Sequence, residues 1–182
     1  MQLIRVTKSI KEYKQIKKLY RQAFPIEERA PFWLLMKKAK PATADFWALY
    51  DDENWVGIAY VVKSEELAYI FYLAIKPEER GKKYGGTALD ILRDYYKGCK
   101  LFLALEALDQ TADNYQQRVK RHSFYEKCGL LDMPYKIKEA SVIYDVMGVG
   151  GIVEPEEYGR MMENYLGTFF KRLVDVRILK DS

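Results

Sequence analysis

The sequence predicts one mixed α/β domain, and three observations lead to this fold class. The chain has 182 residues, of which 49% are hydrophobic, which is enough apolar surface for one sizeable core but too little chain for two large domains. Its hydrophobic residues follow strand spacing in some segments and helical spacing in others. A strand-like segment, 67–76, precedes a helical segment and a second strand-like segment, 100–106, and this order implies a parallel pair of strands.

The first forty residues are expected to form a short strand, 3–6, and two helices. Ser9 and Glu12 form a capping-box pattern ahead of a helical repeat that ends at Pro25. A second helix is expected to begin at Pro31, because proline suits the first helical position.

The middle of the chain is expected to contribute most of a sheet. Residues 45–50, 55–62 and 67–76 have strand character and are separated by turn-prone or polar residues, so we expect an antiparallel meander. After Pro77 the apolar residues follow helical spacing as far as Tyr96, and a buried strand follows.

The last third is expected to finish the sheet and add one helix. A helix over 113–127, ended by Gly129 in a position where glycine favours a left-handed cap, precedes strands over 130–137 and 141–147. Beyond a glycine-rich break, a helix over 154–173 carries a wide apolar stripe. We therefore divide the chain into a domain, 1–150, and a C-terminal helix in 151–182 that packs on this domain or at a homodimer interface.

The composition excludes several classes of protein. Two cysteines cannot build a disulfide framework, and one histidine without a nearby cysteine pair leaves no metal-ligand cluster, so we expect no metal. No apolar stretch approaches the roughly 18–20 residues of a membrane span, and the N-terminus has no signal-peptide core, so we expect a cytoplasmic protein without a membrane partner. A net charge of +4 is too small to indicate a nucleic-acid partner. With 15 tyrosines and one histidine, acid–base chemistry must use Tyr, Glu, Asp or Lys.

A basic, glycine-rich loop joins a strand to a helix in the centre of the chain. The strand ends in Leu73, Ala74 and Ile75. The loop and helix start comprise Arg80, Gly81, Lys82, Lys83, Tyr84, Gly85, Gly86 and Thr87. Backbone N–H groups and the positive end of a helix dipole converge at such a junction, which suits a pyrophosphate. A helix start that is merely basic and glycine-rich explains the pattern equally well.

Two blocks of the sequence closely resemble the signature blocks of the GNAT superfamily of N-acetyltransferases. They are the loop from Arg80 to Gly85 and the segment Ser123-Phe124-Tyr125-Glu126-Lys127-Cys128-Gly129-Leu130. The resemblance covers residues 3–147 and implies a mostly antiparallel central sheet with helices on both faces. The chain departs from the family's loop pattern at Lys83, which occupies the first glycine position, and lysine tolerates fewer backbone dihedral angles than glycine.

The resemblance also implies the co-substrate, acetyl-CoA. The amides of Gly81 to Gly86 would bind its pyrophosphate, and the strand ending at Ile75 would pair with its pantetheine arm. On the following helix, a turn of about 100° per residue places four side chains within roughly a 60° arc. They are Asn114, Arg118, Arg121 and Tyr125. The first three would contact the nucleotide end of CoA, or they belong to a solvated basic face.

Tyr125 and Glu106 are the candidate catalytic residues. GNAT enzymes commonly use the tyrosine of the second block as the acid that protonates the departing thiolate, although a tyrosine is also a common core residue. Glu106 ends the strand after the loop helix and is the candidate base, with an ordinary ion pair as the alternative. Tyr69 or Tyr72 could instead orient a water that takes the proton.

The acceptor is expected to be a small-molecule or peptide amine. Glu27 and Glu28 lie between the first two helices, in the region that lines the acceptor pocket of GNAT folds, and could receive a cationic amine, although acids at a helix start are common on surfaces. The expected function is therefore transfer of an acetyl group from acetyl-CoA to a primary amine in a ternary complex. A non-catalytic CoA-binding or protein-interaction module is the alternative.

Overall fold

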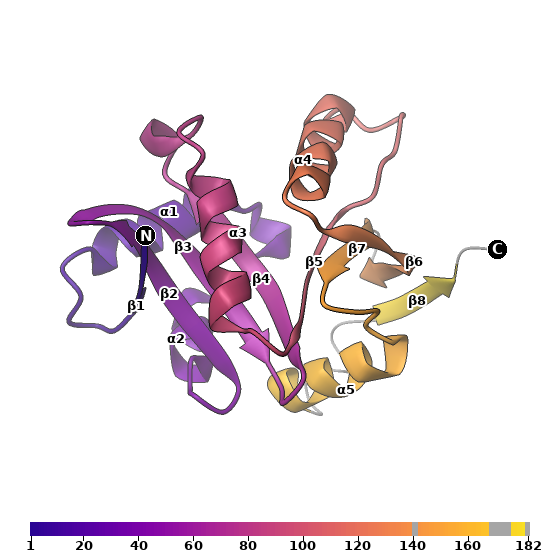
Figure 1. Cartoon of the computed structure of the whole chain (residues 1–182), viewed down its shortest axis with the longest axis horizontal. Helices are drawn as coiled ribbons and strands as arrows, with labels where there is room; N and C mark the ends of the chain where they lie inside the picture. Colours follow the sequence, from indigo (N-terminus) through magenta and orange to yellow (C-terminus); the bar gives the residue numbers. More distant parts are fainter. Residues whose placement is uncertain (140–141, 168–175, 181–182) are drawn as a thin grey trace. The chain divides into compact units, whose positions relative to one another are not determined.

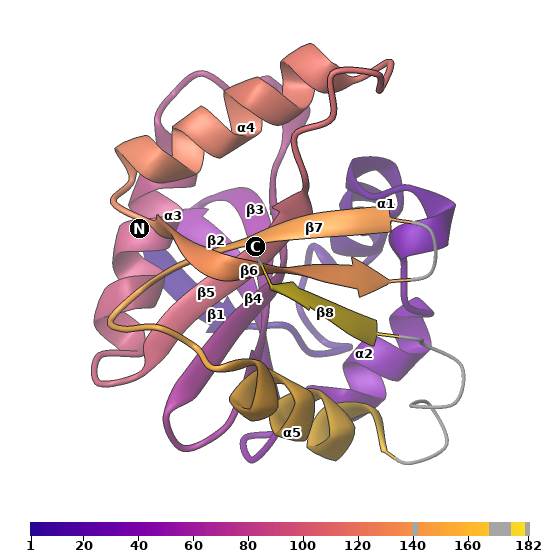
Figure 2. The same ribbon diagram turned by 90° about the vertical axis from the view of Figure 1, so that its right-hand side faces the viewer.

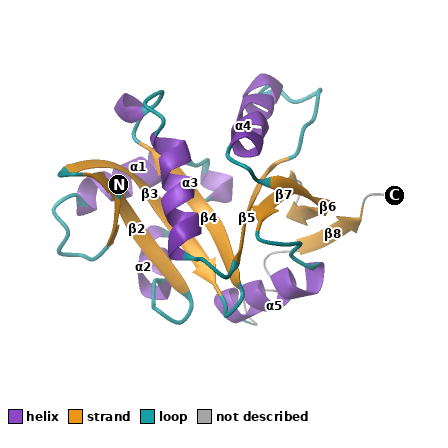
Figure 3. Ribbon diagram, in the orientation of Figure 1, coloured by secondary structure: helices purple, strands orange, loops and turns teal. Residues whose placement is uncertain are grey.

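The computed structural model describes residues 1–139, 142–167 and 176–180, and the chain forms two compact units. The first unit is Met1–Lys63 with Ile70–Lys97, and the second is Ser64–Tyr69 with Gly98–Ser182. The strand order is β1-β2-β3-β4-β5-β7-β6-β8, and β4 contributes residues to both units. Helices and strands occur in both units (Figure 3).

The first unit is a largely antiparallel sheet with helices on its two faces. Its strands are β1 (Gln2–Arg5), β2 (Ala44–Asp51), β3 (Asn54–Lys63) and most of β4 (Leu67–Ile75), and its helices are α1 (Tyr13–Ala23), α2 (Phe32–Lys38) and α3 (Tyr84–Tyr95). The β1–β2 and β2–β3 pairs are antiparallel. Figure 1 shows α3 in front of β2, β3 and β4, with α1 and α2 behind them. Two 3-10 turns, η1 (Ile26–Glu28) and η2 (Pro77–Glu79), connect these elements.

The second unit completes the strand order. It contains β5 (Lys100–Glu106), α4 (Tyr115–Lys127), β6 (Leu131–Glu139), β7 (Val142–Val149), α5 (Pro155–Leu166) and β8 (Val176–Lys180). The start of β4 pairs in parallel with β5, from Leu67 opposite Lys100 to Tyr69 opposite Phe102. The β5–β7, β6–β7 and β6–β8 pairs are antiparallel, and Figure 2 shows β7, β6 and β8 side by side. The predicted fold class, with one parallel pair in a mostly antiparallel sheet, is confirmed.

A buried ionic network ties the strands of the first unit together. Asp45 on β2 is fully buried, and its carboxylate lies 2.7 Å from both Arg5 on β1 and Lys63 on β3. The hydroxyl of Tyr96, just after α3, donates to Asp45 at 2.8 Å and accepts from the indole of Trp47 at 2.9 Å. Burial is the main cause that raises the pKa of Tyr96. A buried carboxylate is tolerated here because its charge is paired and hydrogen-bonded.

The predicted capping box of the first helix is wrong. Helix α1 begins at Tyr13, no side chain caps it, and the Ser9 hydroxyl pairs with Thr7 at 2.8 Å. Glu12 instead accepts a hydrogen bond from the hydroxyl of Tyr50 on β2. The local pattern assigned the Glu12 carboxylate to the helix start, but this carboxylate makes a tertiary contact with Tyr50 instead.

The C-terminal helix is shorter than predicted within the described residues. Helix α5 ends at Leu166, because Gly167 follows with φ 80°, and the remainder of the predicted helix, 168–173, lies outside the described residues. The apolar face of α5 is buried in the second unit, where Tyr158 contacts the rings of Tyr69 and Phe102. Strand β8 was not predicted. None of the helices in the described ranges is long and apolar enough to cross a membrane.

Candidate active site

The loop before α3 contains two residues with left-handed backbone. Gly81 has φ 79°, and open space surrounds the position of a Cβ atom there. Lys83, the residue before the first turn of α3, has φ 66° and ψ 3°. This conformation costs a residue with a side chain about 1 kcal/mol relative to glycine. Lys83 therefore has a left-handed backbone, which glycine favours, at the position where the family pattern has glycine.

The N-terminal end of α3 is open to a ligand. No side chain caps it, and the first intrahelical bond runs from the amide of Thr87 to the carbonyl of Lys83, at 3.2 Å. The amides of Tyr84, Gly85 and Gly86 precede this bond and therefore have no partner within the helix. An uncapped helix start with positive charges beside it suits a phosphate group.

The basic side chains of the loop differ in how they are paired. Lys82 Nζ lies 2.9 Å from Glu79 Oε2, and this pairing is the main cause that lowers the pKa of Glu79. Arg80 Nε donates weakly to the carbonyl of Ile75, at 3.4 Å. The Tyr84 hydroxyl donates to Asp51 on β2 at 2.8 Å. This bond is the main cause that raises the pKa of Tyr84, and it directs the side chain of Tyr84 to β2. The exposed side chain of Lys83 has no acidic partner among the described residues, so its charge is available to an anion.

The last residues of β4 lie close to β3. A Cβ atom on Gly57 of β3 would lie 2.4 Å from the carbonyl oxygen of Ala74, so only glycine fits there. Ala74 is buried, whereas Leu73 and Ile75 are partly exposed. The segment predicted to pair with the pantetheine arm thus has two partly exposed side chains, those of Leu73 and Ile75, on one face of β4. Its backbone lies against β3 at Gly57.

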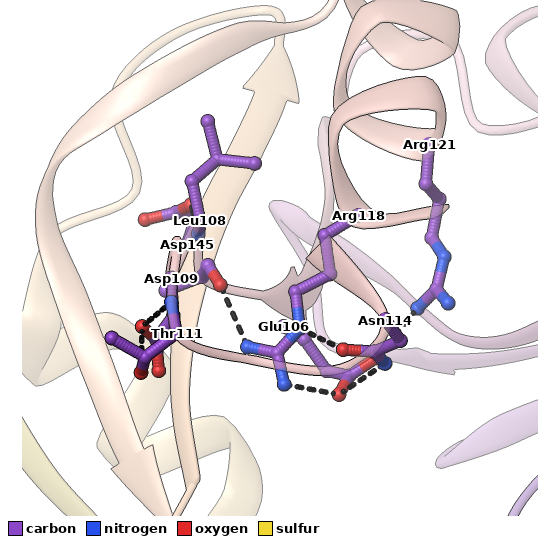
Figure 4. Close-up of polar contacts among 9 residues, drawn as sticks. Glu106, Leu108, Asp109, Thr111, Asn114, Arg118, Arg121 and Asp145 are labelled. Carbon is purple, nitrogen blue, oxygen red and sulfur yellow. Dashed lines mark hydrogen bonds and ion pairs between the residues drawn. The ribbon is translucent and has the colours of Figure 1, made fainter. Parts of the chain in front are cut away.

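In the second unit, one carboxylate contacts two side chains of α4 and the side chain of the residue before it (Figure 4). Arg118 Nη2 lies 2.9 Å from Glu106 Oε1, and Arg121 Nη1 lies 3.3 Å from Oε2. The amide of Asn114 donates to both oxygens at 3.3 Å. Asn114 is the residue before α4, but its side chain does not cap the helix. The structure therefore joins the candidate base to all three residues predicted to contact the nucleotide of CoA.

Two aspartates that the sequence analysis did not select hold the loop after β5. The amide of Leu108 donates to Asp145 on β7 at 3.2 Å. Asp109 accepts from the amide and the hydroxyl of Thr111, at 2.9 and 2.6 Å. The contact of Asp145 joins distant parts of the sequence, so only the tertiary structure identifies it. The contacts of Asp109 are local, because an aspartate commonly accepts from the residue two positions later in a turn.

Tyr125 is a partly buried residue in the last turns of α4. Its ring contacts Phe124, and no hydrogen bond joins its hydroxyl to the described part of the chain. Burial raises the pKa of Tyr125 to about 12, although the positive charge of Arg121 acts in the opposite direction. The helix ends two residues later and Gly129 has φ 83°, which confirms the predicted left-handed cap. The phenol is therefore protonated at neutral pH and its O–H is available to donate.

The predicted acceptor residues divide between the two units. In the first unit, Tyr72 on β4 donates to the carbonyl of Glu28 at 2.8 Å and accepts from the amide of Ala30 at 3.0 Å. In the second unit, Tyr69 is buried and stacks on Phe102, with ring centroids 4.9 Å apart. The structure thus brings together Glu28 and Tyr72 and places Tyr69 in a core. The side chain of Glu27 lies outside the described residues.

One further cluster in the second unit has the residue types of a metal site. His122 Nε2 lies 2.9 Å from Asp132, and Nδ1 lies 3.7 Å from Glu126. One ligand atom from each residue falls within 4.8 Å of the others. The spacing of His122 and Glu126, four residues apart on α4, was the sequence signal for this cluster. The same geometry also suits a surface ion pair of a protonated histidine.

Comparison with solved structures shows the same fold in known acetyltransferases. A Bacteroides thetaiotaomicron protein assigned to the GNAT family superposes with a TM-score of 0.70 at 19% identity, covering 93% of this chain and 98% of that one. An aminoglycoside 6'-N-acetyltransferase in complex with coenzyme A gives 0.62 at 15% identity, with 85% and 99% covered. A variant of the spermidine N-acetyltransferase from Vibrio cholerae gives 0.63 at 16% identity, with 92% and 98% covered. A search of the curated proteins found no match.

The sequence itself matches a family description. The acetyltransferase (GNAT) family matches residues 13–130, which include the loop before α3, Glu106 and the whole of α4. These residues hold both blocks on which the resemblance rested. The chain is a member of the acetyltransferase (GNAT) family and thus an acyltransferase.

Proposed function

We propose that this acyltransferase moves an acetyl group from acetyl-CoA to a primary amine by direct attack in a ternary complex. The position and the protonation state of Tyr125 are the observations that carry the proposal. Tyr125 lies in the second signature block, its phenol is protonated at neutral pH, and its hydroxyl makes no hydrogen bond to the described residues. A group of this kind can donate to a thiolate as it leaves.

The loop before α3 would hold the phosphates of acetyl-CoA. The open amides at the start of α3 and the unpaired charge of Lys83 support this role. Arg80 and Lys82 would add positive charge, and the partly exposed Leu73 and Ile75 would flank the pantetheine arm. Acetyl-CoA supplies the thioester, a reactive acetyl donor that needs no further activation by a bound metal.

The proposed reaction forms a C–N bond and an S–H bond and breaks a C–S bond and an N–H bond. The nitrogen of the neutral amine attacks the thioester carbonyl carbon, the C–N bond forms, and the C–S bond breaks. Tyr125 donates its O–H proton to the departing sulfur, so that CoA leaves as the thiol. The proton that the nitrogen loses as it becomes the amide passes to solvent, from which the Tyr125 oxygen regains its proton. The reference pKa of a thiol, near 8.5, lies below the value of about 12 for Tyr125, so the phenol keeps its proton at rest and stabilises the developing thiolate.

A base must also take a proton from the amine, because a lysine-like amine is mostly charged at neutral pH. Glu106 is the proposed base. Its two oxygens receive four contacts, from Asn114 twice and from Arg118 and Arg121 once each. A carboxylate offers about four lone-pair sites, so Glu106 must release one contact before it accepts a proton. Arg121 is the most exposed of these partners and would release Oε2 when it turns to a CoA phosphate.

The proposed acceptor is a small-molecule or peptide amine that is positively charged in solution. Glu27 and Glu28 on η1 would attract it, and Tyr72 fixes the backbone of this segment. Aminoglycosides and spermidine, the amines named for two structural relatives, are suitable first candidates. Their chemistry, several amino groups on a flexible or ring scaffold, matches an acidic acceptor segment.

Residues 1–150 would form the acetyltransferase domain, and 151–182 would be an addition to it. The burial of Tyr158, Met161, Met162 and Tyr165 supports packing of α5 on its own protomer.

The experiment combines calorimetry with an amine panel. We expect acetyl-CoA to bind, and we expect thiol release with at least one member of a panel of aminoglycosides, spermidine, lysine and peptide α-amines. Mass spectrometry should find the acetylated amine in equal amount to the released thiol. Binding without turnover across the panel would support the non-catalytic alternative, and the absence of binding at millimolar acetyl-CoA would overturn the proposal.

A further inference from the structure

Each nitrogen of the Arg118 guanidinium bonds to an oxygen of the chain itself. Its Nε donates to Asn114 Oδ1 at 2.7 Å, its Nη1 donates to the carbonyl of Ala107 at 2.8 Å, and its Nη2 lies 2.9 Å from Glu106 Oε1. Each of the three nitrogens therefore has a different partner. The side chain is only 15% exposed. Figure 4 shows Glu106 and Asn114 on the same side of its guanidinium.

Arg121, one turn further along α4, is a natural comparison. Its only hydrogen bond within the described residues is the 3.3 Å contact with Glu106, and its side chain is 42% exposed. A guanidinium offers five N–H donors in a planar fork, and a phosphate needs two adjacent donors for a bidentate contact. Arg121 makes one such bond and is 42% exposed, so it can supply a pair of donors more readily than Arg118, which already uses three of its five donors and is only 15% exposed.

The partners of Arg118 come from both ends of one connection. Glu106 and Ala107 lie where β5 ends, and Asn114 lies where α4 begins. The loop between them is also tied to β7, through the Ala107 amide to the carbonyl of Ile143 at 2.8 Å. Arg118 thus closes the connection and fixes the Glu106 carboxylate with respect to α4, the helix that carries Tyr125.

We propose that Arg118 is a positioning residue for Glu106 and does not bind the phosphates of CoA. This inference rests on the proposed function, because it assigns Arg118 a place in the proton transfer from the amine. Arg118 orients Oε1, and Oε2 remains the oxygen that accepts the proton. The phosphate contact predicted for this helix face then belongs to Arg121.

A double-mutant cycle in the full-length protein tests the proposal. We expect Arg118→Gln to lower kcat about 10-fold while the KM for acetyl-CoA changes less than about twofold, and Glu106→Gln to lower kcat about 100-fold. The kcat of the double variant should equal that of Glu106→Gln within about twofold. A residue that acts only through Glu106 has no further effect once the Glu106 carboxylate is gone. Arg118→Lys, which retains the charge but cannot reach three partners, should fall between the wild type and Arg118→Gln.

Arg121→Gln is the matched control. It should raise the KM for acetyl-CoA severalfold and change kcat less than Arg118→Gln does. Thermal denaturation of every variant shows which ones fold. If Arg118→Gln does not fold, Arg118→Lys is used for the test in its place.

Several results would overturn the inference. They are a raised acetyl-CoA KM in Arg118→Gln, a loss that persists in full on the Glu106→Gln background, or unchanged kcat in either single variant. A wild-type protein that turns over no amine would overturn the proposed function itself.

Discussion

Lys83 keeps a side chain at a backbone position where glycine is the favoured residue. Its left-handed conformation costs about 1 kcal/mol, and its side chain forms no ion pair within the described residues that would offset this cost. A strained residue is retained when another requirement holds it in place. Binding of the negatively charged co-substrate provides that requirement under the proposed function.

We expect Lys83→Gly to raise the free energy of unfolding and weaken the binding of acetyl-CoA. Relief of about 1 kcal/mol of strain is partly offset by about 0.5 kcal/mol of extra backbone entropy in the unfolded chain, so the net gain is about 0.5 kcal/mol. Loss of the unpaired charge should raise the Kd severalfold. Chemical denaturation and calorimetry measure the two effects.

Lys82→Gly is the control, because Lys82 has no left-handed backbone and is paired with Glu79. It should lower the stability. Unchanged or tighter binding in Lys83→Gly would contradict the role given to this charge.

At the scale of elements, Tyr72 links β4 to the segment that connects α1 and α2. Its hydroxyl binds the carbonyl of Glu28 and the amide of Ala30, and the hydroxyl of Tyr20 donates to the carbonyl of Ala30 at 2.8 Å. Tyr72 also packs against Phe24, with ring centroids 4.7 Å apart. The structure gives Tyr72 a structural task, which is to hold the acidic segment, whereas the water-orienting role predicted for it stays a prediction.

We expect Tyr72→Phe to loosen this segment without unfolding the protein. The amide of Ala30 loses its acceptor, and a net hydrogen-bond contribution of about 1 kcal/mol corresponds to roughly fivefold faster hydrogen exchange. The KM for the amine should rise, and the KM for acetyl-CoA should not. Exchange measured by NMR or mass spectrometry gives the first result. Tyr20→Phe is the control, because it removes a bond to the carbonyl of Ala30 and not to its amide, and it should leave the exchange of the Ala30 amide nearly unchanged. If the Ala30 amide exchanges as slowly in Tyr72→Phe as in the wild type, Tyr72 does not hold this segment.

Strand β5 and the end of α4 were predicted correctly, whereas the cap of α1 and strand β8 were not. Strand β5 has the predicted bounds, because a run of apolar residues between polar ones is a local feature. The capping box failed because Glu12 has a tertiary partner, Tyr50, that no local pattern contains. Strand β8 pairs with β6, far away in sequence, and this pairing is not encoded locally.

At the scale of the whole molecule, the candidate site was predicted as a set of residues but not as a set of contacts. Helical spacing correctly grouped Asn114, Arg118 and Arg121 on one face. Spacing gives the direction of side chains around a helix axis, and it cannot say what lies opposite them. That partner, Glu106, depends on how α4 follows β5 in the second unit.

The many tyrosines of the sequence have distinct roles in the structure. Tyr96 completes a buried ionic network, Tyr72 holds a loop, and Tyr69 belongs to a core. Tyr125 differs from them, because its hydroxyl makes no hydrogen bond within the described ranges. The lack of a partner alone does not select Tyr125, because the buried hydroxyl of Tyr135 also has no hydrogen-bond partner among the described residues. Tyr125 is the proposed acid because it also lies in the second signature block.

The most direct test of the account is the pH profile of thiol release by the wild type and by Tyr125→Phe. Because the pKa of Tyr125 is raised to about 12, its phenol stays protonated below that pH, and only above it would the acid be lost. The wild-type kcat should therefore show no alkaline fall up to about pH 10, while kcat/KM for the amine rises as the amine loses its proton. Tyr125→Phe should lower kcat about 100-fold across this range and retain the KM for acetyl-CoA. Full activity in Tyr125→Phe, or a wild-type kcat that falls above about pH 8.5, would contradict the assignment of Tyr125 as the acid.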